Sequence, residues 1–363
     1  MTDKRKWFEK PMRICALQTA EGGEGTGALK VWKKMGFNVE QLLHAIGQDY
    51  YAVFREEHEP ILSDYLQRAR RAGIRIILYL NTHVLRPDVQ GWEQWCARGE
   101  PLSGYGTWRY GCLNTSWSDW LIQSARRACE LGVDGIFSDG PNMRACHCEA
   151  CRRRRPRDAD PDAFGVDTAV QFMRRLCETI KAVNPDAICY QNLQVMRPDA
   201  ERFLPYNDLV GSEGGFMFYG PPGPAWLWKP SLTAKALEAA AGGKPTVVFC
   251  AADQKPWSLY PHAPGETKLL FAPCVANGAN VWYGPHFPQK LLKSEAGRAA
   301  GEINCFLEKH ERWYDETESA ATVGLFYSAA SAAHYRTSTE ESDFYSEAGH
   351  AVAHGPGDVM ESL

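Results

Sequence analysis

Short apolar runs alternate with helical stretches along most of the 363-residue chain, and this alternation constrains the fold more than any other feature. The run RIILYL is almost entirely apolar, which is typical of a strand covered on both faces. Eight strands are expected, at residues 13–19, 37–44, 75–80, 133–137, 187–192, 208–213, 246–251 and 279–283. Helices are expected between them, among others at residues 28–35, 60–73, 116–131, 167–183, 231–241 and 289–311.

Eight strand and helix units in this length predict a (β/α)8 TIM barrel, an α/β fold that typically needs about 250 residues. A doubly wound open sheet is the alternative. Such a sheet usually has fewer units and a glycine-rich phosphate-binding turn after its first strand. The loop EGGEGTG occupies that position but does not match G-x-G-x-x-G, so we interpret it as a barrel loop.

Composition and charge exclude several classes of protein. The net charge of -4 offers no general attraction to nucleic acid or to an anionic membrane. The basic run at residues 152–155 is interpreted as a solvated patch at the start of a helix. No stretch reaches the roughly 20 apolar residues of a membrane span, and MTDKRKWFEKP lacks the apolar core of a signal peptide. We therefore expect no nucleic-acid partner, no membrane partner and a cytoplasmic location.

The segment VDGIFSDGPNMRACHCEAC, residues 133–151, joins an expected strand to a carboxylate and a cysteine motif. Asp139 follows the strand, and the spacing C-x-C-x2-C supplies three thiolates, from Cys146, Cys148 and Cys151. A closed structural zinc site needs four ligands. Cys112 is the best fourth ligand, because its loop and the loop after the fourth strand share one rim of a barrel, whereas His147 is a weaker candidate. We expect a structural Zn2+ held by these four cysteines.

Three carboxylates follow expected strands, namely Asp139 after the fourth, Glu213 after the sixth and Asp253 after the seventh. Acidic residues at the carboxyl ends of different barrel strands face one pocket. Two carboxylates beside a sugar ring are the minimum equipment for glycoside hydrolysis, because one attacks or activates water and the other protonates the leaving oxygen. A helix N-cap or a buried salt bridge is the alternative for any one of them. The aromatic loop at residues 216–228 would raise the pKa of Glu213 by desolvation, which suits proton donation.

Aromatic, amide and imidazole side chains near the expected strand ends would complete a sugar-binding pocket, because flat rings stack on sugars and polar groups bind hydroxyls. A carbohydrate is therefore the expected partner. The candidates for substrate binding are Gln18, His44, Asn81, His83, Trp108, Asn142, Gln191, Asn192, Asp253, Trp257, Trp282 and His286.

The block DGIFSDGPN followed by CHCEAC, with CLNTSWSDWL upstream, resembles the barrel glycoside hydrolases grouped with family 42 β-galactosidases and with the hypothetical glycosyl hydrolase families. The resemblance covers roughly residues 10–330, and its specific part is the cysteine pattern. Family 42 enzymes hold zinc by a cysteine before the helix that precedes the fourth strand and by C-x-C-x2-C after that strand. Those positions are occupied here by Cys112, Cys146, Cys148 and Cys151.

The catalytic positions depart from family 42, which uses Asn-Glu at the end of the fourth strand and a Glu on the seventh. Here the fourth strand ends in Ser138, Asp139 and Gly140, and the seventh offers no Glu. An Asp in this setting resembles the nucleophile of α-L-fucosidases and related retaining α-glycosidases, several of which take their acid from the sixth strand. This resemblance implies that Asp139 is the nucleophile and Glu213 the general acid/base, with Asp253 as a substrate-binding or alternative acid residue.

Two other functions stay open. A metal-dependent barrel hydrolase would need more histidines at strand ends than the three that are placed suggestively, His44, His83 and His286. A non-catalytic barrel would bind carbohydrate without turning it over.

The last part of the chain leaves the barrel pattern. We expect the barrel in residues 1–318 and the start of an incomplete second α/β domain in residues 319–363. TVGLFYS, residues 322–328, looks like a new strand. The resemblance equates it with the first strand of the flavodoxin-like trimerisation domain that follows the barrel in family 42. It therefore implies that the chain is a fragment and that the full-length protein is a homo-oligomer, a dimer or a trimer. From the residues alone, an irregular appendage to the barrel is the alternative.

Overall fold

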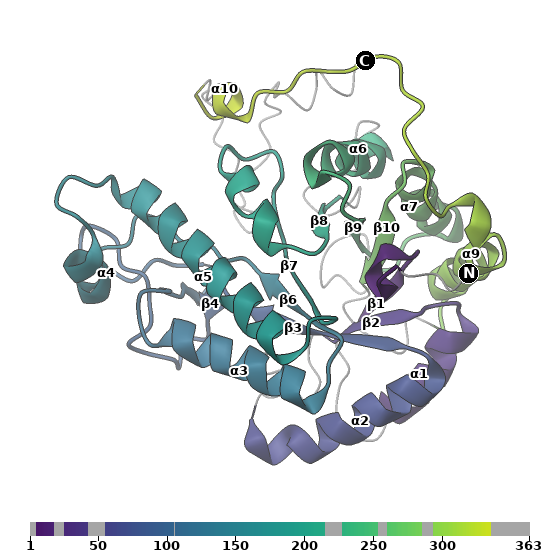
Figure 1. The fold of residues 1–363 in the computed structure, drawn as a ribbon, viewed down its shortest axis with the longest axis horizontal. Coiled ribbons are helices and arrows are strands. Elements are labelled where there is room, and N and C mark those ends of the chain that lie inside the picture. The colour runs from purple at the N-terminus through teal and green to yellow at the C-terminus, as the bar shows by residue number, and fades with distance from the viewer. Residues whose placement is uncertain are drawn as a thin grey trace.

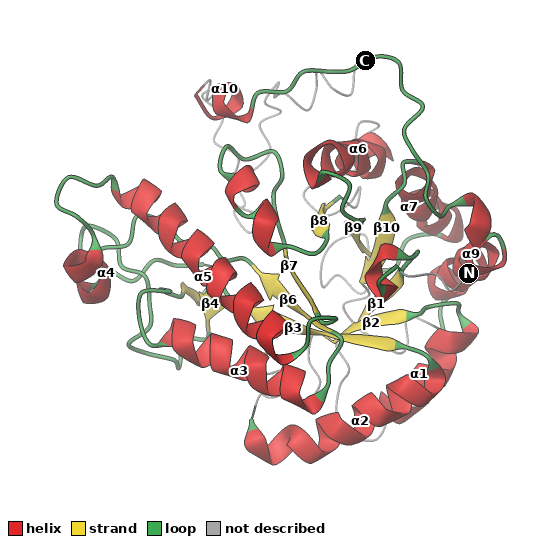
Figure 2. Ribbon diagram, viewed as in Figure 1, coloured by secondary structure: helices red, strands yellow, loops and turns green. Residues whose placement is uncertain are grey.

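The computed structural model describes residues 5–17, 25–42, 55–104, 106–214, 227–252, 260–284 and 293–334. Eight parallel strands form a nearly closed barrel inside a ring of helices (Figure 2). This confirms the predicted TIM-barrel fold. The strands of the barrel are β1 (Arg13–Leu17), β2 (Val39–Leu42), β3 (Arg75–Asn81), β6 (Gly135–Asp139), β7 (Ile188–Gln191), β8 (Val210–Glu213), β9 (Thr246–Ala251) and β10 (Asn280–Gly284).

The strands follow one another around the barrel in the order of the chain. The sheet order is β7-β6-β3-β2-β1-β10-β9-β8, so that β7 and β8 form its two edges. These edges also meet, because Asn192 and Gly211 form a parallel bridge and the backbone N–H of Leu193 donates to the carbonyl of Gly211 at 3.0 Å. The carboxyl ends of all eight strands therefore face the same mouth.

The outer ring consists of α1 (Gly25–Lys34), α2 (Glu59–Ala72), α3 (Trp117–Leu131), α5 (Pro161–Val183), α6 (Lys229–Ala241), α7 (Pro264–Ala276) and α9 (Glu295–Lys309) (Figure 1). Local sequence sets the ends of these helices. Gly73 and Gly132 end α2 and α3 with φ of 71° and 97°, a conformation that favours glycine. Asp160 caps α5 by accepting a hydrogen bond from the backbone N–H of Ala163 at 2.8 Å, so α5 begins six residues before the expected start at residue 167.

Side chains that alternate along the strands fill the barrel interior. Phe137 of β6 lies at its centre, with ring centroids 4.8 Å from Tyr190 and 5.4 Å from Phe249. Truncating one such buried aromatic side chain costs about 3–5 kcal/mol. Because successive strand residues point to opposite faces, the next inward positions after Phe137 and Tyr190 are Asp139 and Asn192. The apolar interior therefore ends where these polar side chains begin.

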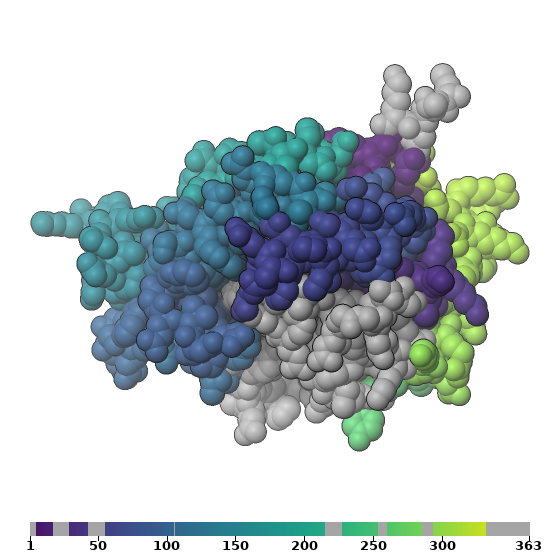
Figure 3. Space-filling view, turned by 90° about the horizontal axis from the view of Figure 1, so that it is seen from below, coloured from purple at the N-terminus to yellow at the C-terminus, as the bar shows by residue number. Residues whose placement is uncertain are grey.

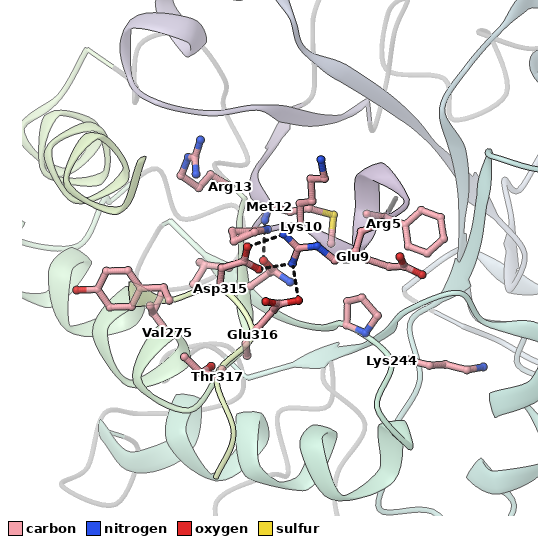
Figure 4. Close-up of a pocket in the computed structure, with 18 of the residues that line it drawn as sticks. Arg5, Glu9, Lys10, Met12, Arg13, Lys244, Val275, Asp315, Glu316 and Thr317 are labelled. Carbon is pink, nitrogen blue, oxygen red and sulfur yellow. Dashed lines mark hydrogen bonds and ion pairs between the residues drawn. The ribbon is translucent and has the colours of Figure 1, made fainter. Parts of the chain in front are cut away.

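The amino end of the barrel is closed by the segment before β1, in which Phe8 of the 3-10 helix η1 (Trp7–Glu9) is buried. A hollow of about 670 Å³ lies there, lined by residues that precede strands, such as Asn207 and Lys244. Arg5 crosses it to Asp315, with both nitrogen–oxygen distances 2.8 Å (Figure 4). Lys244 is bonded to two backbone carbonyls. Because these charged groups hold chain segments together, we assign the hollow a structural role.

The segment at residues 322–328 does not form the predicted strand. It runs over the outside of the barrel toward α10 (Ala329–His334), and Val323 and Phe326 are 87% and 90% exposed (Figure 1). A strand needs a neighbouring edge for its backbone hydrogen bonds, and in the part of the chain described here no edge pairs with this segment. Its contact with the barrel includes a hydrogen bond from the Tyr327 hydroxyl to the Met196 carbonyl at 3.2 Å. The second domain expected after residue 318 stays a prediction.

No helix in the described ranges has the length and the apolar character that crossing a membrane requires.

Candidate active site

Asp139 ends β6 at the mouth of the barrel, and its backbone is fixed by the turn that follows β3. The register pairs it with Asn81. Its carbonyl oxygen accepts a hydrogen bond from the backbone N–H of Thr82 at 3.1 Å and lies 2.8 Å from Nδ1 of His83. A carbonyl only accepts, so Nδ1 of His83 carries the proton in this arrangement. The strand end that carries the carboxylate is therefore rigid.

Neutral donors from both neighbouring strands hold the Asp139 carboxylate. Oδ2 accepts a hydrogen bond from the hydroxyl of Tyr79 in β3, and Oδ1 accepts one from Nδ2 of Asn192, just after β7, at 3.2 Å. The backbone N–H of Asn192 in turn donates to the carbonyl of Ser138 at 3.0 Å. The carboxylate is thus oriented by two side chains that the sheet itself positions.

Glu213 ends β8, and the same amide nitrogen connects it to Asp139. Nδ2 of Asn192 donates to Oε1 of Glu213 at 3.0 Å. The two carboxylate oxygens therefore lie no farther apart than these two hydrogen bonds of 3.2 and 3.0 Å placed end to end. The structure brings together the two acids that the sequence analysis singled out as catalytic.

Burial raises the pKa of Glu213 to about 7, and the negative charge of Asp139 adds to the increase. The hydrogen bond from Asn192 and the charge of Lys229 act in the opposite direction but are weaker. A carboxyl group with a pKa near neutrality can both donate and accept a proton at working pH. The two neighbouring acids are therefore suited to different tasks.

The other predicted substrate-binding residues differ in where they lie. Asn81 is buried, and its Oδ1 accepts from the backbone N–H groups of His83 and Val84 at 3.2 and 3.1 Å, so this oxygen is used by the turn. Trp282 lies in the barrel interior, packed against Phe249. Trp108 lies in the loop between β3 and α3, and Asn142 is exposed just after β6. Outside the described residues lie Gln18, His44, Asp253, Trp257 and His286.

Gln191, another predicted substrate-binding residue, lies on the outer face of β7. Its neighbours Tyr190 and Asn192 point into the barrel, so Gln191 points outward. There it is buried, and its Oε1 accepts a hydrogen bond from Nδ2 of Asn207 at 3.4 Å. Tyr79 is not among the predicted site residues, although its position two residues before Asn81 places it on the same face of β3.

Four cysteines form a second cluster beside the mouth. Their sulfur atoms all lie within 4.8 Å of one another, and the members are Cys112, Cys146, Cys148 and Cys151. Four sulfurs around zinc, each about 2.3 Å from the metal, would be about 3.8 Å apart, so the set fits a tetrahedral zinc ion. Hydrogen bonding with Cys112 is the largest effect on the Cys148 thiol and lowers its pKa. The Asn114 amide also donates to the sulfur of Cys151 at 3.3 Å.

The cysteine cluster joins the long loop between β3 and α3 to the segment after β6. The loop contains a short antiparallel pair, β4 (Val84–Leu85) with β5 (Arg109–Tyr110), and the segment after β6 contains α4 (Glu149–Arg154). The buried side chain of Gln94 donates to the carbonyls of Gly111 and Asn142 at 2.8 and 2.7 Å. In the space-filling view, the blue residues near 100 and the teal-blue residues near 150 project together from one end of the molecule (Figure 3).

No protein-family model matches the chain, and no curated protein matches its sequence. Solved structures resemble its fold. An α-L-fucosidase isoenzyme 2 from Paenibacillus thiaminolyticus is 17% identical, with a TM-score of 0.65 over 84% of this chain and 50% of that one. A β-galactosidase from Rahnella sp. R3 is 13% identical, with a TM-score of 0.66 over 85% of this chain and 57% of that one. A β-galactosidase from Bacillus circulans sp. alkalophilus is 14% identical, with a TM-score of 0.63 over 85% and 57%.

The chain spans between half and about three fifths of the length of these structures. At such low identity the likeness is one of fold. The chain has the TIM-barrel fold that these glycosidases share.

Proposed function

We propose that the chain is a glycoside hydrolase that uses two carboxylates and retains the anomeric configuration, with Asp139 as nucleophile and Glu213 as general acid/base. One observation carries the proposal, which is that a single nitrogen of Asn192 hydrogen-bonds both carboxylates at the mouth of the barrel. TIM-barrel enzymes carry their active sites at this end. The α-L-fucosidase and β-galactosidases with the same fold support a carbohydrate substrate.

The reaction has two steps in this proposal. In the first, a carboxylate oxygen of Asp139 bonds to the anomeric carbon while the bond to the leaving oxygen breaks, and that oxygen takes the proton of Glu213. In the second, Glu213 takes a proton from water while the water oxygen bonds to the anomeric carbon. The bond to Asp139 breaks at the same time, and its electron pair returns to the carboxylate.

The spacing of the two acids supports retention. Retaining glycosidases have their carboxyl groups about 5–5.5 Å apart, whereas inverting ones need about 6.5–9.5 Å to admit a water molecule. The hydrogen bonds of 3.2 and 3.0 Å to one nitrogen of Asn192 hold an oxygen of Asp139 close to an oxygen of Glu213, an arrangement that admits the retaining spacing. The raised pKa of Glu213, about 7, supports its role as the group that carries the proton first.

The four cysteines would hold a structural zinc ion. Four thiolates complete a tetrahedral shell, so no coordination position remains for water or substrate. When bound, the metal would cross-link the loop between β3 and α3 to the segment after β6. Three of its cysteines, Cys146, Cys148 and Cys151, follow Asp139 closely in the chain, and the role of the cluster in this proposal is to keep the rim of the pocket in place.

A panel of chromogenic α- and β-glycosides, including fucosides and galactosides, tests the proposal, with proton NMR of the first sugar anomer released. Hydrolysis with retained configuration is the expected result. Inversion would rule out Asp139 as a nucleophile. Sugar binding without turnover on any member of the panel would instead favour a non-catalytic binding barrel, and turnover that requires a readily exchanged metal would favour a metal-dependent hydrolase.

A further inference from the structure

Tyr79 is a buried tyrosine of β3 whose hydroxyl donates a hydrogen bond to Oδ2 of Asp139. The strand register pairs it with Phe137, one inward position below the carboxylate. Its ring packs against that of Phe137 with centroids 5.9 Å apart, and its side chain is 8% exposed. A tyrosine side chain has only two rotatable bonds, so this packing fixes the place of the hydroxyl.

The hydroxyl of Tyr79 and the amide of Asn192 hold the Asp139 carboxylate from opposite sides. Each oxygen accepts one hydrogen bond, Oδ2 from Tyr79 and Oδ1 from Asn192. A carboxylate oxygen has about two lone pairs, so each oxygen keeps one for another partner. Among the described residues, the other titratable groups that face this carboxylate are Glu213 and His83, whose Nδ1 lies 3.8 Å from Oδ2.

We infer that Tyr79 is a positioning residue, an inference that rests on the proposed function. Tyr79 orients the Asp139 carboxylate for attack and stabilises this carboxylate when it leaves the sugar. In the second step the electron pair of the breaking bond returns to Asp139, and the donor from Tyr79 then faces a full negative charge. In the first step that charge is consumed, so the same hydrogen bond weakens. Loss of the hydroxyl therefore slows hydrolysis of the covalent intermediate more than its formation.

The test compares Tyr79→Phe with the matched variant Tyr65→Phe. Tyr65 also donates to a buried carboxylate, that of Glu40 at 2.5 Å, but on the helix side of β2 and away from the mouth. On an aryl glycoside with an activated leaving group, kcat of Tyr79→Phe falls about 10- to 100-fold, the value of one hydrogen bond to a charged group. Because hydrolysis of the covalent intermediate slows more than its formation, KM falls together with kcat and kcat/KM changes less. Tyr65→Phe keeps the kcat and KM of the wild type.

Turnover of Tyr79→Phe within twofold of the wild type, with an unchanged KM, would overturn the inference. A wild-type protein that hydrolyses no glycoside would instead remove the proposed function. In that case the hydrogen bond between Tyr79 and Asp139 is tested by a double-variant cycle. The free energies of unfolding of Tyr79→Phe, Asp139→Asn and the double variant are compared with that of the wild type. Non-additive losses support the interaction between the two side chains, and additive losses contradict it.

Discussion

The two ends of the barrel treat their charged side chains in opposite ways. At the amino end, Arg5 and Asp315 neutralise each other through two hydrogen bonds of 2.8 Å. At the carboxyl end, Asp139 and Glu213 are neighbours of like charge, and a hydroxyl and an amide hold them in place. At the amino end the opposite charges of Arg5 and Asp315 cancel, whereas at the carboxyl end two acidic groups lie side by side.

This difference indicates a structural role for the ion pair at the amino end and a catalytic role for the two acids at the carboxyl end. In an ion pair that joins distant chain segments, the carboxylate is engaged with its cation and does not serve as a nucleophile or a proton donor. Two adjacent carboxylates held, among the described residues, by a hydroxyl and an amide cost stability, so their presence at a strand end points to a function that needs them. Substitution of an acid at the carboxyl end should therefore lower turnover, and substitution in the ion pair at the amino end should lower the free energy of unfolding.

The largest effect is expected for the matched pair Asp139→Asn and Asp315→Asn. The first should lower kcat at least about a thousandfold, because a neutral amide cannot act as the nucleophile, while the fold stays as stable as the wild type. The second should leave kcat within twofold and lower the free energy of unfolding by about 1 kcal/mol, because its ion pair is partly exposed. Steady-state kinetics and urea unfolding measure both. Comparable turnover in the two variants would contradict the assignment of catalysis to the carboxyl end and of stability to the amino end.

Glu213→Ala should affect turnover in a manner that depends on the leaving group. The first step with a poor leaving group should slow about 10²- to 10⁴-fold, because that group needs a proton, whereas an activated phenolate needs none. Glu311→Ala, at the amino end beside Arg13, is the control and should show the wild-type dependence. A plot of log(kcat/KM) against leaving-group pKa gives the result, and equal slopes in Glu213→Ala and the wild type would argue against the acid role.

The pH profile should reflect the raised pKa of Glu213, about 7. The first step needs its protonated form, so kcat/KM should fall as pH rises above about 7, approaching tenfold for each pH unit. In Glu213→Gln this basic limb should disappear, since the amide does not titrate. A basic limb that persists unchanged in the variant would assign it to another group.

Removal of the cysteine cluster should lower stability more than it changes chemistry. Cys112→Ser should lose bound zinc, lower Tm and reduce kcat only severalfold, because the metal would support the rim rather than touch substrate. Cys305→Ser, which changes an exposed cysteine of α9, should keep the wild-type metal content and Tm. Elemental analysis together with a thermal melt makes the comparison. A zinc-free wild type, or full zinc retention in Cys112→Ser, would contradict the assignment.

The smallest expected effect lies at Glu40, a buried carboxyl outside both ends. Burial raises its pKa well above the usual value, so the folded protein binds more protons than the unfolded chain above pH about 4.3. The free energy of unfolding therefore falls as pH rises through the window between these two pKa values. Glu40→Gln should show a weaker fall between pH 5 and pH 8 and wild-type kcat. An identical pH dependence in both proteins would mean that Glu40 does not titrate in this way.

The sequence was sufficient to predict the barrel and the two clusters at its rim, because both follow from local patterns. An apolar strand that ends in Asp139 places this carboxylate at the mouth, and C-x-C-x2-C after it predicts a set of thiolates. Joining Cys112 to that set required only the rule that neighbouring strands share a rim. The function of these residues still rests on the proposal.

Features that depend on distant register or on tertiary pairing could not be predicted in this way. The orientation of Gln191 depends on which residues of β7 face inward, and the contact of Tyr79 depends on the pairing of β3 with β6. Arg5 and Asp315 meet from opposite ends of the chain. Residues 322–328 have the composition of a strand, but a strand forms only where another edge receives it.

The identity of the nucleophile is the central claim, and trapping it is the most direct test. A 2-deoxy-2-fluoro glycosyl fluoride of the sugar found in the screen slows hydrolysis of the covalent intermediate, so that mass spectrometry of peptides can locate the sugar. A single labelled peptide with the sugar on Asp139 is the expected result. A label on any other carboxylate, or an active enzyme that inverts configuration and takes up no label, would contradict it.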